Sequence, residues 1–183
     1  MAQPDKSLKF GWLPLRSGPA TRGAAGIAAA ALLAFAFSGS ALAARTLFAG
    51  GNWAAIDFGD GCEARTKALW ARPGTLPIAG FAFDSTGSRQ GQFYVRLNRA
   101  ARPGASVMVK IGSKPFLLAG RGEWAWSASA GQQRAMLEAA RYGEAMRVDS
   151  RDLRGRRIVD RYTLAGAATA IDSAAAACAG KRR

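Results

Sequence analysis

Residues 53–70 of the chain read WAAIDFGDGCEARTKALW, and this stretch decides the fold class. Two segments with strand-like patterns, 53–58 and 63–70, flank Gly59-Asp60-Gly61. Glycine and aspartate favour the tight turn that joins two antiparallel strands. The stretch therefore predicts a β-hairpin.

The pattern of short strands and turns continues along the chain. Further strands are predicted at 78–84 (IAGFAFD), 92–98 (QFYVRLN), 105–111 (ASVMVKI) and 115–119 (PFLLA). Arg72-Pro73-Gly74 and Arg102-Pro103-Gly104 each fit a type II turn, with proline followed by glycine at the two central positions. Five or more strands with short turns predict an antiparallel sheet, as a sandwich or a partly open barrel.

The last third of the chain changes to a helical period. Residues 132–142 (QQRAMLEAARY) predict a helix that has Ser127 or Ser129 as its N-cap and ends at Gly143. Two more strands, 146–148 and 157–162, are predicted around a basic turn, and residues 167–177 predict a second helix. The expected class is α+β, a mainly antiparallel sheet with two late helices.

Residues 1–43 have the layout of a signal peptide. Four basic side chains precede an uncharged run at 24–37, and Ala41-Leu42-Ala43 offers a cleavage site after Ala43. The run has 14 residues, whereas a membrane-spanning helix needs about 20. We therefore expect Sec export to the periplasm, with only transient contact with the membrane. An uncleaved inner-membrane anchor facing the periplasm is the alternative.

Cleavage would leave residues 44–183 as one β-rich domain. Without the four leader cations and one leader acid, the domain keeps 22 basic and 11 acidic side chains, a net charge of +11. Such a charge attracts an anionic envelope component or an acidic protein partner. A GC-rich genome would yield the same abundance of arginine and alanine without any selection for binding.

The chain contains no histidine. This excludes Ser-His-Asp and Cys-His triads and histidine-ligated zinc. We recognise no cofactor or metal motif and expect no catalysis. A Ser-Lys dyad or a carboxylate pair would be the remaining enzymatic alternative.

Both cysteines, Cys62 and Cys178, lie in the predicted exported part. An oxidising compartment favours their pairing, which would connect the first hairpin to the last helix. Two separate thiols are the alternative, since only compartment and even number favour the bridge.

Two groups of residues are candidates for binding. Trp124 and Trp126 leave the same face if their segment is a strand; we expect them to cover the core, and a solvent-facing platform for sugar or lipid is the alternative. Arg154, Arg156 and Arg157 would form an anion site if their turn projects, and a solvated hairpin tip without a ligand is the other interpretation. Export argues against a nucleic-acid partner for the basic and aromatic strand 89–97.

Trp53 followed by Cys62-Glu63-Ala64, together with the closing segments YTLAG (162–166) and AID (170–172), resembles the invasion-associated locus B family of exported bacterial proteins. The resemblance covers the two ends of the mature domain. It implies a small, β-rich, periplasmic or surface-associated protein with a role in host-cell invasion, and it supplies no catalytic residues.

Overall fold

The structure, a computed structural model, describes residues 44–182, so the predicted signal peptide (1–43) lies outside the described residues. Within them, ten strands form one antiparallel sheet in the order β1-β2-β3-β4-β5-β8-β7-β6-β9-β10. The strands are β1 (Arg45–Gly50), β2 (Trp53–Asp57), β3 (Gly61–Lys67), β4 (Ile78–Asp84), β5 (Gln90–Arg96), β6 (Val107–Ile111), β7 (Lys114–Arg121), β8 (Trp124–Trp126), β9 (Ala145–Arg151) and β10 (Arg157–Thr163).

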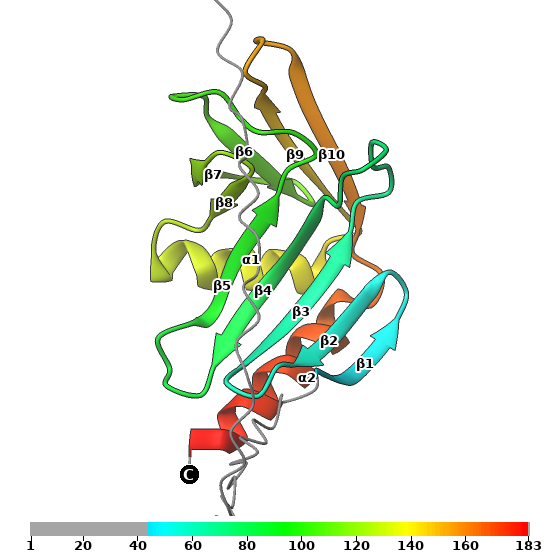
Figure 1. Cartoon of the computed structure of the whole chain (residues 1–183). Coiled ribbons are helices and arrows are strands. Elements are labelled where there is room, and N and C mark those ends of the chain that lie inside the picture. Colours follow the sequence, from blue (N-terminus) through cyan, green and yellow to red (C-terminus); the bar gives the residue numbers. More distant parts are fainter. Residues whose placement is uncertain (1–43, 183) are drawn as a thin grey trace, which may run out of the picture. The chain divides into compact units, whose positions relative to one another are not determined.

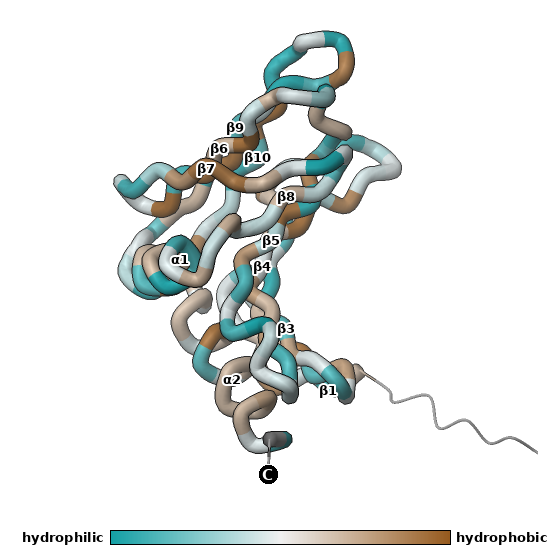
Figure 2. The backbone as a smooth tube through the Cα atoms, turned by 90° about the vertical axis from the view of Figure 1, so that its left-hand side faces the viewer, coloured by the Kyte–Doolittle hydropathy of each residue, from teal (hydrophilic) through white to brown (hydrophobic). Residues whose placement is uncertain are grey.

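Two helices cover one face of the sheet, as Figures 1 and 2 show from two directions. Helix α1 (Ala130–Tyr142) packs mainly on β5, and helix α2 (Ala167–Ala179) packs on β1 to β4. Ser129 caps α1 by accepting a hydrogen bond from the Gln132 main chain (3.2 Å), and Gly143 ends the helix. The predicted class, a mainly antiparallel sheet with two late helices, is confirmed; the strands form one open sheet with β1 and β10 at its edges and not the two sheets of a sandwich.

The core lies between the helices and the inner faces of the strands. Its aromatic centre is Trp53, Phe81 and Phe93: the Trp53 and Phe81 rings stack at 6.3 Å between centroids, and Phe93 meets Phe81 edge-on at 5.3 Å. Helix α2 buries mostly small side chains against the sheet. Because alanine is short, the helix backbone can lie close to the strands.

The β1–β2 turn contacts the segment that joins β10 to α2. The Trp53 indole donates to the Thr163 carbonyl (2.9 Å), and the Asn52 amide donates to the Ala165 carbonyl (3.3 Å). Gly166 has a left-handed φ of +91°, and a Cβ placed there would lie 2.2 Å from the Gly50 carbonyl oxygen. Glycine is therefore required for both conformation and space.

Several strand boundaries differ from the prediction by two or three residues, as at β9, which continues to Arg151 and not only to residue 148. Two larger differences have a structural reason. Strand β1 was not predicted, because it is a half-exposed edge strand whose alternation is broken by an irregularity between Thr46 and Phe48. Strand β3 ends at Lys67, whereas the prediction continued it to residue 70. The chain turns away because the Leu69 amide donates to the Arg161 carbonyl on β10 (2.8 Å).

A disulfide joins Cys62 on β3 to Cys178 on α2, 116 residues apart in sequence. Beside it, Lys181 pairs with Asp57 and donates to the Gly59 carbonyl (2.8 Å). The Lys181 ammonium and the Gly59 amide hold the pKa of Asp57 below its usual value. A covalent bond and an ion pair thus fasten the end of α2 to the first hairpin.

Replacing both cysteines, Cys62→Ser and Cys178→Ser, should lower the free energy of unfolding by about 2–5 kcal/mol, because a long loop is no longer closed in the unfolded chain. Urea unfolding of the variant and the parent measures the difference. The parent protein under reducing conditions is the control and should match the variant. Reaction of the native, unreduced protein with a thiol reagent would contradict the bridge.

Gly166→Ala should destabilise the protein more than Gly74→Ala. Both glycines have positive φ, +91° and +75°, but a Cβ at Gly74 has no atom within 4 Å. We expect a loss of about 1 kcal/mol at Gly74 from conformation alone and at least about twice that at Gly166, where the backbone must also move. Thermal unfolding of the two variants tests this, and equal losses would contradict the close contact.

Candidate functional site

The turn between β9 and β10 is organised by the buried carboxylate of Asp152. It accepts hydrogen bonds from the Arg154 and Arg156 amides (3.0 and 2.9 Å), from Arg156 Nε (2.9 Å) and from Arg99 (2.7 Å). Burial raises the pKa of Asp152, but these donors outweigh it and leave the pKa below its usual value. Asp152 therefore stays ionised and fixes the shape of the turn.

The three arginines predicted as an anion site have different surroundings. Arg156 pairs with Asp152, and Arg157 pairs with Asp149 (3.0 Å), which Arg147 also contacts (2.7 Å). Arg154 is exposed and has no acidic partner among residues 44–182. Anion binding at this turn stays a prediction, with Arg154 the side chain most available for it.

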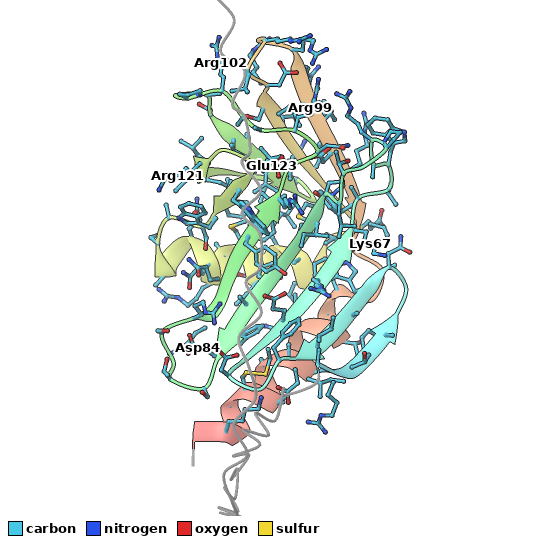
Figure 3. All side chains as sticks on the ribbon, in the orientation of Figure 1. Lys67, Asp84, Arg99, Arg102, Arg121 and Glu123 are labelled. Atoms are coloured by element: carbon cyan, nitrogen blue, oxygen red, sulfur yellow. A yellow bond between two sulfur atoms is a disulfide. The ribbon has the colours of Figure 1, made fainter. Side chains whose placement is uncertain are left out.

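The fold places further arginines, distant in sequence, close to the β9–β10 turn. The Arg102 amide donates to the Arg151 carbonyl (3.0 Å), which joins the loop after β5 to β9. A cavity of about 490 Å³ is lined by Trp70, Arg72, Arg99 and Arg157 among others. We call the resulting surface the arginine-rich end; its arginines are Arg72, Arg99, Arg102, Arg151, Arg154, Arg156 and Arg157. Figure 3 labels Arg99 and Arg102 beside the β9–β10 hairpin.

Acidic side chains at the arginine-rich end are fewer and less accessible. Asp149, Asp152 and Asp160 face seven arginines, and Asp152 and Asp160 are buried. Burial also raises the pKa of Asp160, more than the hydrogen bonds from Asn98 lower it. The outer surface of this end is therefore strongly positive.

Large apolar side chains stand exposed among these arginines. Leu153 at the tip of the hairpin is 67% exposed, and Trp70 in the β3–β4 loop, which lines the same cavity as Arg72 and Arg99, is 64% exposed. Buried Asn98 holds this loop: its side-chain oxygen accepts from the Arg72 amide (3.0 Å). The apolar side chains are thus presented from anchored loops.

Trp124 and Trp126 lie elsewhere, on the sheet face opposite to the helices. The expectation that they cover the core is wrong: they are 42% and 37% exposed, while Ala125 between them is fully buried. Strand alternation places the small alanine inward, where β8 meets β5 and β7. The two rings line a groove of about 350 Å³ with Tyr94, Gln92 and Glu63 among others.

Side chains for the enzymatic alternative are scattered. The carboxylates that line described cavities stand singly: Asp160, Glu63 and Asp149 each belong to a different one. Ser113 and Lys114 lie in and beside the exposed β6–β7 turn. Residues 44–182 hold no cluster of three or more potential metal-ligating side chains, and no helix among them is long and apolar enough to span a bilayer.

No protein-family model, curated protein or solved structure matches this chain significantly.

Proposed function

We propose that this is an exported, non-enzymatic protein of the cell envelope that binds an anionic envelope component through the arginine-rich end. The observation that carries the proposal is the gathering of seven arginines, from three loops and the adjoining ends of β9 and β10, around three carboxylates of which two are buried. A general compositional bias would scatter arginines over the surface. The uneven placement favours a binding role instead.

Exposed apolar side chains narrow the class of anionic partner. Leu153 and Trp70 stand among the arginines. Moving a leucine or tryptophan side chain from water into a lipid interface is favourable. Guanidinium groups bind phosphate through paired hydrogen bonds. The combination suits the phosphate head groups of an anionic lipid layer better than a soluble polyanion.

Binding to vesicles tests this function. Protein purified from the periplasm of an expressing bacterium should sediment with phosphatidylglycerol vesicles and not with phosphatidylcholine vesicles, and added salt should release it. The double variant Arg102→Glu, Arg154→Glu should bind at least about tenfold more weakly, since each basic side chain near an anionic surface contributes about 1 kcal/mol. Neither arginine has an ion-pair partner among residues 44–182 that the change would break.

A matched control separates location from total charge. Lys114→Glu with Arg134→Glu makes the same change in net charge on β7 and α1, away from the arginine-rich end. This control should bind nearly as well as the parent. Equal loss of vesicle binding in both double variants would show that only net charge matters and not the arginine-rich end. Equal binding of the parent protein to both kinds of vesicle would also refute the proposal.

Export is proposed on the leader alone. N-terminal sequencing of the periplasmic protein should begin at Ala44, because the small side chains of Ala41 and Ala43 suit signal peptidase. An intact Met1 in the membrane fraction would instead establish the anchored alternative. Membership of the invasion-associated locus B family is a further hypothesis; Trp53 and Thr163, both in the segments that carry the resemblance, are hydrogen-bonded to each other.

A further inference from the structure

The groove beside Trp124 and Trp126 lies over β4, with aromatic side chains on one side and polar side chains on the other. Its floor on β4 includes Ala82, and next to it Gly80 leaves space for the Tyr94 ring: a Cβ on Gly80 would lie 3.0 Å from the Tyr94 hydroxyl and 2.5 Å from the Ala64 carbonyl oxygen. The Tyr94 side chain can therefore reach across β4 from β5. Its hydroxyl donates to Glu63 on β3 (2.7 Å).

Aromatic rings form one wall of this groove. Tyr94 and Trp126 are cross-strand partners, and the rings of Tyr94 and Trp124 lie 6.2 Å apart. The Arg96 guanidinium stands 5.9 Å from the Trp124 ring centroid and fixes that ring from one side. Three aromatic side chains thus line one side of the groove and remain partly open to solvent.

Polar side chains form the other wall, and their charges cancel. Arg65 lies 3.8 Å from Glu63, Arg89 pairs with Asp84 (3.3 Å), and Arg96 pairs with Glu123 (3.1 Å). Of these side chains only Glu63, Arg65 and Arg89 line the groove itself, and each of the two lining arginines has a carboxylate beside it. In a domain whose surface is otherwise strongly basic, this groove is electrically balanced.

We infer that the groove binds an uncharged carbohydrate chain. Sugar rings offer weakly positive C–H faces to the negative faces of aromatic rings, and their hydroxyl groups suit a wall that mixes carboxylate, guanidinium and the Gln92 amide. A polyanion would find each lining arginine already beside a carboxylate, and a purely apolar partner would offer no hydrogen bond to the Gln92 amide or to the Glu63 oxygen that Tyr94 does not contact. The inference is independent of lipid binding at the arginine-rich end, which lies on other residues.

Isothermal titration with three uncharged tetrasaccharides tests the inference. The probes are the β-1,4-linked tetramers of N-acetylglucosamine and of glucose, and the α-1,4-linked tetramer of glucose. We expect at least one to bind the periplasmic protein with a Kd of about 1 mM or tighter. Trp126→Ala should weaken that binding at least about tenfold, since it removes a stacking surface.

Trp70→Ala is the matched control, because Trp70 is a more exposed tryptophan outside the groove. It should keep sugar binding and lose part of the vesicle binding, whereas Trp126→Ala should do the reverse. Glu63→Gln, which preserves shape, is the second groove variant and should also weaken sugar binding if Trp126→Ala fails to fold by circular dichroism. Absence of binding by all three probes, or equal loss in Trp70→Ala and Trp126→Ala, would overturn the inference.

Discussion

The attachment of α2 to the first strands is the constraint on which the rest of the described structure depends. The Cys62–Cys178 disulfide fixes one end of the helix, and Gly166, lying against Gly50, fixes the other. Between these points the helix presents mainly alanines to the sheet. Its packing therefore stabilises the fold through close approach of the helix backbone to the strands and not through large buried side chains. With α2 in place the helix-covered face is buried, and the opposite face of β3, β4, β5 and β8 is left to form a groove.

Charge is distributed unevenly over the molecule, and this separates two surfaces with different chemistry. At the arginine-rich end the acids are buried or shared, as at Asp152, so the outer guanidinium groups dominate. Around the aromatic groove each arginine has a carboxylate nearby. The first surface suits phosphate and lipid, and the second suits a neutral, hydroxyl-rich chain.

Local sequence signals predicted most elements because they depend on short-range chemistry. The Ser129 cap, the glycine turns and the alternation of β5 and β6 act within a few residues, and both late helices were placed to within a few residues. Strand β1 was missed because half-exposed edge strands lack a clear period. The end of β3 was misplaced because a long-range hydrogen bond to Arg161, rather than any local breaker, stops the strand.

The sequence by itself determined the fold class and the absence of histidine chemistry, since these follow from composition and local pattern. It favoured pairing of Cys62 with Cys178 but left two separate thiols open, and the bridge is seen only in the structure. Only the tertiary structure decided the surroundings of each candidate side chain. It turned Trp124 and Trp126 outward because Ala125 occupies the core position between them. It also brought Arg72, Arg99 and Arg102 to the β9–β10 turn, because strand pairing joins segments that no short-range signal connects.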